Sequence, residues 1–316
     1  MKIKVILLLA GFVTTSGSAY AGEFSNRFMP NDMNYALSQW TADDEWAAEV
    51  QYSFKYIFYN CILHNEKDLF GCDKNAKGKA HLYLKYTGEF DFYAGSRESG
   101  PVINRTSNIA LQLRWDMQDS SKFIKYIEWY DIGFEHRSDG QVTDANLTDD
   151  DPLSATFGQY LAEIEYQNDN HEYFDTLSRG ADYISLSFGG PLSESVNYSF
   201  KYKIYDSGEE SNITWGELAG TDTDFADYDL LTFSLSKKIS TGNKYAGNIL
   251  TLTADYTAGR GGMDTDSIDI SLIIPLKSED GWDIPLLIRA HAGPMDRLSD
   301  YTRSRDSVGV GLAFSF

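Results

Sequence analysis

Hydrophobic and polar residues alternate along much of the chain, as they do in strands that turn one face to an apolar environment. The last eleven residues show the pattern: Val308, Val310, Leu312, Phe314 and Phe316 share one parity, and only Ser, Gly and Ala stand between them. Because neighbouring side chains of a strand point to opposite faces, each such run predicts a strand with one apolar and one polar side. About 9 to 11 residues of this kind cross a bilayer as a tilted strand.

Twelve runs of this type follow one another along the chain, and their bounds are Asn34–Trp40, Ala48–Tyr59, Leu82–Tyr93, Asn108–Met117, Ile127–Ser138, Ala181–Gly189, Val196–Tyr205, Tyr228–Ile239, Asn248–Thr257, Ser267–Leu276, Pro285–Gly293 and Asp306–Phe316. An even number of antiparallel strands can close into a ring that leaves no unpaired edge in lipid. We therefore predict an all-β protein, a 12-stranded antiparallel transmembrane β-barrel with both termini in the periplasm. One barrel domain, residues 22–316, accounts for the chain after its leader.

That leader is residues 1–21, which read as a secretory signal peptide. Lys2 and Lys4 precede the apolar stretch Val5–Val13, and Ala19-Tyr20-Ala21 forms a small-x-small cleavage site. Beyond it the chain has no run of about 18 apolar residues, so we expect no membrane-spanning helix. The protein is therefore expected to be exported.

Composition narrows the choice of partner and compartment. The formal net charge of -20 argues against a nucleic-acid partner, which would need a basic surface. Aromatic residues are abundant, with 21 Tyr, 18 Phe and 6 Trp, as the aromatic girdles of a membrane barrel require. Cys61 and Cys72 lie close together in an exported chain, so we expect them to form a structural disulfide.

The candidate chemistry lies on the fifth and sixth runs. His136 and Ser138 continue the apolar face that Phe134 belongs to, and Asp182 shares the face of Ile184 on the next run. A lone histidine in such a place is more often an ordinary rim residue. Two adjacent strands that turn His, Ser and Asp to the lipid side instead favour a nucleophile, a base and an orienting group that meet at the rim.

The stretch His136–Gly140 resembles the His-x-Ser-Asn-Gly motif of the outer membrane phospholipase A family. Further similar stretches are residues 178–182, 99–101, 293–301 and 307–312. The resemblance implies a calcium-dependent phospholipase A1/A2 that hydrolyses acyl esters of phospholipids in the outer membrane of a Gram-negative bacterium. It also implies a homodimer.

Carried over position by position, the resemblance makes Ser138 the nucleophile, His136 the general base, and Asp182 the orienting group in place of the family's asparagine. It assigns Ca²⁺ to three oxygen ligands: the Gln141 carbonyl, the Ser178 hydroxyl and, from a partner chain, the Ser99 carbonyl. Oxygen ligands of this kind suit calcium. Without the resemblance, these three would be interpreted as solvated loop residues.

Three departures and two alternatives accompany this interpretation. Ala181 stands where the family has a tryptophan before the orienting residue. The loop 141–177 is longer than the family's, and Gly88 replaces a glutamine that links the family's dimer, which weakens the expectation of a homodimer. The main alternative is a non-catalytic barrel that serves as a channel or surface adhesin, with inward ionic residues that could pair or conduct, namely Lys201, Lys203, Arg114, Asp116 and Asp255. An outer-membrane protease would instead need acidic and histidine pairs that face the lumen.

Overall fold

The computed structural model describes residues 27–42, 45–60, 78–93, 102–117, 126–139, 164, 168, 179–206, 224–242, 249–277, 283–298 and 301–314. Its strands are β1 (Phe28–Pro30), β2 (Asn34–Thr41), β3 (Trp46–Asn60), β4 (Gly78–Phe92), β5 (Val102–Met117), β6 (Trp129–Asp139), β7 (Arg179–Ser193), β8 (Val196–Tyr205), β9 (Leu231–Ser240), β10 (Ile249–Ala258), β11 (Ser267–Lys277), β12 (Asp283–Ala292) and β13 (Ser307–Phe314). Two short helices, α5 (Phe225–Tyr228) and η1 (Met263–Thr265), complete the described elements. No helix in these ranges is long and apolar enough to cross a membrane.

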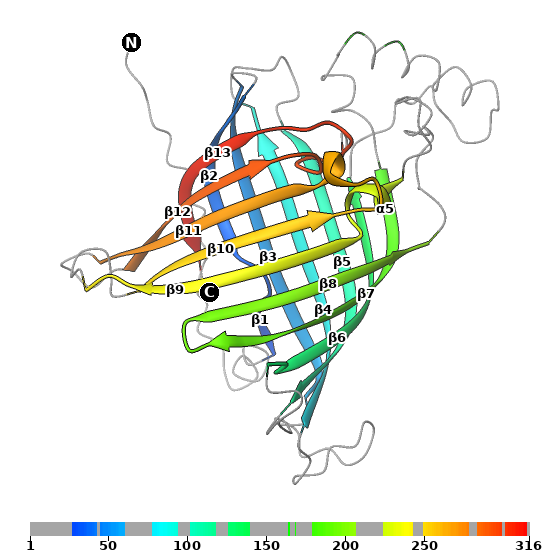
Figure 1. Cartoon of the computed structure of the whole chain (residues 1–316), viewed down its shortest axis with the longest axis vertical. Helices are drawn as coiled ribbons and strands as arrows, with labels where there is room; N and C mark the ends of the chain where they lie inside the picture. Colours follow the sequence, from blue (N-terminus) through cyan, green and yellow to red (C-terminus); the bar gives the residue numbers. More distant parts are fainter. Residues whose placement is uncertain are drawn as a thin grey trace, which may run out of the picture.

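The strands form a closed antiparallel barrel (Figure 1). From β2 to β13 each strand pairs with its neighbour in the chain, and β13 pairs with β2 to close the ring. β1 pairs with residues Phe54–Tyr56 of β3, whereas β2 pairs with residues Trp46–Gln51 of the same strand. The two strands therefore lie end to end along one edge of β3. The predicted 12-stranded barrel is thus confirmed, with β1 as one additional strand.

Most predicted runs coincide with strands, and β8 has the predicted bounds, Val196–Tyr205. The predicted run Tyr228–Ile239 corresponds to β9. Its predicted start is wrong, because β9 begins at Leu231. Phe225–Tyr228 forms a helical turn instead, since the Asp224 side chain accepts a hydrogen bond of 2.8 Å from the Ala226 amide and caps it. The rings of Phe225 and Tyr228 in this turn pack against the ring of Tyr301.

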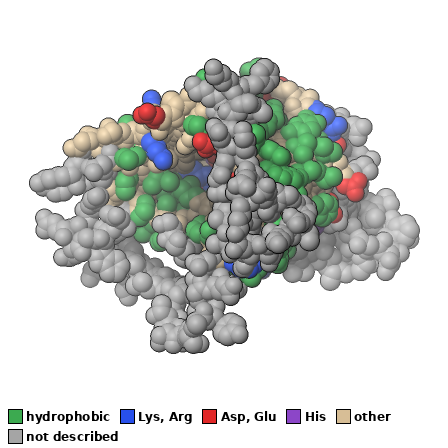
Figure 2. All heavy atoms as spheres, turned by 90° about the horizontal axis from the view of Figure 1, so that it is seen from below, with side chains coloured by type: hydrophobic (Ala, Val, Ile, Leu, Met, Phe, Trp, Pro, Cys, Tyr) green, Lys and Arg blue, Asp and Glu red, His purple; other side chains and the backbone are tan. Residues whose placement is uncertain are grey.

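The two faces of the barrel wall differ in polarity. Large hydrophobic side chains such as Phe134, Leu111 and Ile184 are exposed on the outside, where Figure 2 shows hydrophobic side chains gathered over the wall. Charged side chains such as Glu135 and Glu49 are buried inside. Apolar outside and polar inside is the arrangement that a barrel in lipid requires.

The seam between β13 and β2 depends on two glycines. A Cβ on Gly309 would lie 2.5 Å from Leu37 Cδ1, and one on Gly311 would lie 2.1 Å from the Ala36 carbonyl oxygen. Side chains at these positions would therefore push the two strands apart. Their absence lets the seam close over a small buried cluster: Tyr35, Leu37, Leu287 and Ala313.

Candidate active site

His136 and Asp182 face each other across β6 and β7 on the outside of the barrel. They are register partners, and His136 Nδ1 lies 2.8 Å from Asp182 Oδ1. The next outward pair on the same strands is Phe134 with Ile184, both exposed. Both side chains of the His–Asp pair are about one-third exposed, at 32% and 33%. The pair is thus reachable from the medium around the barrel.

Ser138 lies two residues beyond His136 on the same face of β6. Its register partners are Ser107 on β5 and Gly180 on β7. Two residues of a strand span about 6.6 Å, so a change of side-chain rotamer can bring the hydroxyl to the imidazole. Among the described residues the Ser138 hydroxyl has no hydrogen-bond partner. Such catalytic contacts are often long without substrate and tighten when it binds.

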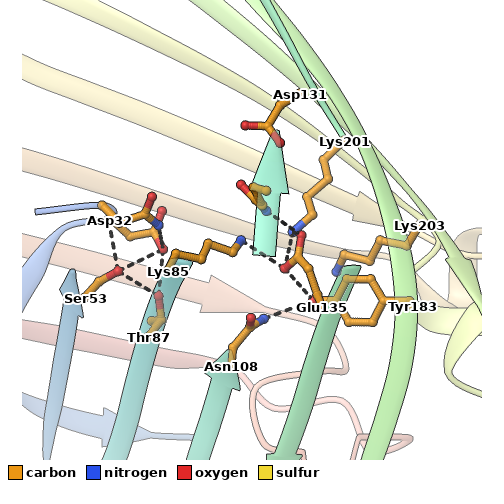
Figure 3. A network of polar contacts seen from close by, with 12 residues as sticks. Asp32, Ser53, Lys85, Thr87, Asn108, Asp131, Glu135, Tyr183, Lys201 and Lys203 are labelled. Carbon is orange, nitrogen blue, oxygen red and sulfur yellow. Dashed lines mark hydrogen bonds and ion pairs between the residues drawn. The ribbon is translucent and has the colours of Figure 1, made fainter. Parts of the chain in front are cut away.

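Glu135 precedes His136 on β6, and its side chain is buried inside the barrel among polar partners from other strands (Figure 3). Its fully buried carboxylate lies 2.9 Å from Lys85 Nζ and 2.8 Å from Lys201 Nζ, and it accepts a hydrogen bond of 3.0 Å from the Tyr183 hydroxyl. These partners come from β4, β7 and β8. A slip of one residue would turn His136 inward, so the Glu135 network helps to fix the register that faces it to Asp182.

A polar cavity of about 540 Å³ lies inside the barrel, away from the His–Asp pair. Charged side chains from several strands line it, among them Lys55, Arg114, Lys201, Lys203 and Asp131. The inward direction predicted for Lys201, Lys203 and Arg114 is thus confirmed. Neither His136, Ser138 nor Asp182 lines the cavity, so the candidate chemistry and the interior are on opposite sides of the wall.

Comparison with known proteins supports the same architecture. The chain is similar to the Salmonella typhi outer membrane phospholipase dimer with bound calcium, with a TM-score of 0.58, 15% identity, and coverage of 91% of this chain and 92% of that one. It is equally similar to outer membrane phospholipase A from Escherichia coli, with a TM-score of 0.58, 15% identity, and coverage of 93% and 96%. The chain has the fold of outer membrane phospholipase A. No protein-family model and no curated protein matches the sequence.

Within this outer membrane phospholipase A fold, several predicted residues lie outside the described part of the chain. These are the calcium ligands Ser99, Gln141 and Ser178, and the cysteines Cys61 and Cys72. The described residues include no cluster of three or more His, Cys, Asp or Glu side chains that could hold a metal. The ligand set and the disulfide therefore stay predictions.

The sequence did not reveal a hydroxyl contact beside Ser138. The hydroxyl oxygens of Tyr86 on β4 and Ser107 on β5 lie 3.0 Å apart, and Ser107 is the register partner of Ser138. Parity alone places Tyr86 and Ser107 on the outer face. Their proximity to each other and to Ser138, however, depends on the register of β4, β5 and β6, which a single sequence does not provide.

Proposed function

We propose that this protein is an outer-membrane phospholipase that hydrolyses acyl esters of phospholipids presented by the surrounding membrane. Ser138 is the nucleophile, His136 the general base, and Asp182 the group that orients the imidazole. The observation that carries the proposal is the 2.8 Å pair of His136 and Asp182 on the outer face, two residues from Ser138. The likeness in fold to outer membrane phospholipase A supports the same function.

The geometry suggests the following steps. His136 Nε2 takes the proton of Ser138 Oγ, and Oγ attacks the ester carbonyl carbon to form a tetrahedral oxyanion. The oxyanion collapses as the carbon–oxygen bond breaks, and the leaving alcohol, a lysophospholipid, takes the proton from the imidazolium. Water then gives a proton to His136 and attacks the carbonyl carbon of the acyl-serine. The bond between this carbon and Oγ breaks, Oγ takes the proton back from the imidazolium, and the fatty acid is released. Throughout, Asp182 accepts the hydrogen bond from Nδ1 and stabilises the imidazolium.

Calcium completes the proposal, with Gln141 and Ser178 as ligands and Ser99 supplied by a partner chain in a homodimer. Asp139 and Arg179 are register partners next to Ser138. In the sequence, Gln141 follows Asp139 by two residues, and Ser178 directly precedes Arg179. Carbonyl and hydroxyl oxygens are hard ligands of the kind that calcium binds. A bound calcium ion would supply positive charge that favours the developing oxyanion.

A first prediction concerns Asp182. We expect Asp182→Asn to keep much of the activity, because an amide oxygen can still accept the hydrogen bond from Nδ1. Asp182→Ala should lose on the order of 10²-fold or more, since the imidazole then lacks a fixed tautomer and orientation. Steady-state fatty acid release from mixed micelles measures both. Asp144→Ala is the control, and a larger loss from Asp144→Ala than from Asp182→Ala would move the orienting role into the loop.

A second prediction concerns calcium. We expect chelation by EDTA to abolish hydrolysis, and added calcium to restore it. Ser178→Ala should raise the calcium concentration needed for half-maximal rate by about tenfold, the loss of one ligand, while the rate at saturating calcium falls less. Calcium titration of fatty acid release in wild type and variant provides the measurement. Hydrolysis that persists unchanged in EDTA would contradict the assignment of calcium.

The polar cavity supports a second candidate function, a channel. The Glu135 network joins strands across the interior, however, and its ion pairs would obstruct a path through the barrel. Fatty acid release from micelles and conductance in planar bilayers separate the two functions. Conductance without hydrolysis would favour the channel over the phospholipase.

A further inference from the structure

Three hydroxyl groups form a row on the outer face, at the level of Ser138. The ring centroids of Tyr52 on β3 and Tyr86 on β4 lie 5.9 Å apart, and the Tyr86 hydroxyl oxygen lies 3.0 Å from Ser107 Oγ on β5. Ser107 is the register partner of Ser138, so their Cβ atoms are about 5 Å apart. The row therefore leads across three strands to the proposed nucleophile.

Gly88 makes room for this row. Tyr52 is its register partner on β3 and Ser107 its partner on β5. A Cβ at Gly88 would lie 2.4 Å from Tyr52 Cζ and 2.5 Å from the Tyr52 hydroxyl oxygen. The Tyr52 ring thus covers the glycine, and a side chain at this position would displace it. The absence of a side chain at Gly88 is therefore what lets the Tyr52 ring lie over this position.

The Tyr86–Ser107 pair has one hydrogen-bond donor more than the pair itself can use. Tyr86 and Ser107 each bring one hydroxyl proton and share one hydrogen bond, so one of the two protons has no acceptor within the pair. Among the described residues Ser107 has no other hydrogen bond. A hydroxyl proton that faces lipid without an acceptor is costly. An acceptor from outside the protein would remove that cost.

We propose that Tyr86 and Ser107 bind the uncleaved ester carbonyl of a two-chain glycerophospholipid while Ser138 attacks the other ester. The inference rests on the proposed phospholipase function and adds a substrate preference to it. The two ester groups of such a lipid are on adjacent glycerol carbons, so both reach the outer face at one depth. The carbonyl oxygen is an acceptor without a proton of its own, which matches the spare donor.

The test compares two phospholipids that differ only in these carbonyls, a diester and a diether with the same head group and chains. Their binding in detergent to the Ser138→Ala protein, which cannot cleave the diester, is measured with and without Tyr86→Phe. Loss of one neutral hydrogen bond should weaken diester binding about three- to tenfold and leave diether binding unchanged. Ser107→Ala should show the same difference, and Tyr202→Phe, an outward tyrosine on β8, should change neither.

Equal weakening of both lipids, or no weakening of either, overturns the inference, because the hydroxyls would then contact the phosphate or no lipid group at all. A parallel assay of fatty acid release by wild type tests the proposed function separately. If wild type releases no fatty acid but the diester–diether difference remains, the subsite stands and the phospholipase assignment fails. If hydrolysis is normal and the difference is absent, only the subsite fails.

Discussion

Ser138→Ala is expected to lower phospholipid hydrolysis by on the order of 10⁴-fold or more, and His136→Ala by a similar factor, because the members of such a unit fail together. Without Oγ no acyl-serine forms, and without the imidazole Oγ keeps its proton and attacks slowly. Release of fatty acid from mixed micelles at saturating calcium measures the loss. Far-UV circular dichroism should show an unchanged β-barrel in both variants.

Ser195→Ala is the matched control, since this serine lies in the turn at the opposite end of β7. It should retain wild-type activity. Near-wild-type turnover in Ser138→Ala would exclude Ser138 as the nucleophile and leave His136 and Asp182 as an ordinary hydrogen-bonded surface pair.

Glu135→Ala is expected to cost about 3–5 kcal/mol of folding free energy, the usual effect of removing one partner of a buried charge pair. The carboxylate is fully buried between Lys85 and Lys201, and both ammonium groups would lose their principal partner. Activity should fall as well, because the strands that hold His136 opposite Asp182 would be less firmly joined. Urea unfolding of the protein in detergent, followed by tryptophan fluorescence, gives the change in free energy.

Glu194→Ala is the control for this measurement, because Glu194 is exposed in the turn between β7 and β8. It should shift the unfolding free energy by no more than about 0.5 kcal/mol. A Glu135→Ala protein as stable as wild type would mean that the network carries little of the energy that holds β6 in register.

Period-two alternation made most of the fold predictable from sequence. His136, Ser138 and Asp182 could be placed on the outer face because parity alone decides the side of a strand. Glu135 could be placed inside for the same reason. Alternation does not predict the register between strands, because the register depends on loops and on partners far away in the sequence. Contact between His136 and Asp182 was therefore an expectation until the structure paired them.

Two features could not be predicted. The start of β9 was misplaced because Tyr228 fits the alternation of the strand equally well, and only the Asp224 cap shows that the chain turns there. The row of Tyr52, Tyr86 and Ser107 was missed because three outward positions on three strands share no sequence spacing. Their contact depends on side-chain rotamers over Gly88, which alternation does not specify.

The seam between β2 and β13, where Gly309 and Gly311 lie, also affects how the barrel assembles. Its two strands are at opposite ends of the chain: Gln39 donates a hydrogen bond to Ser307 across a sequence separation of 268 residues. Every other junction of the ring joins consecutive strands, whose chain closures are all shorter than this one. Joining the ends carries the largest loop-closure entropy, and contacts between distant residues form slowly. The chain should therefore build a curved open sheet first and close it last, and until then the edges of β2 and β13 are exposed to pairing with another chain.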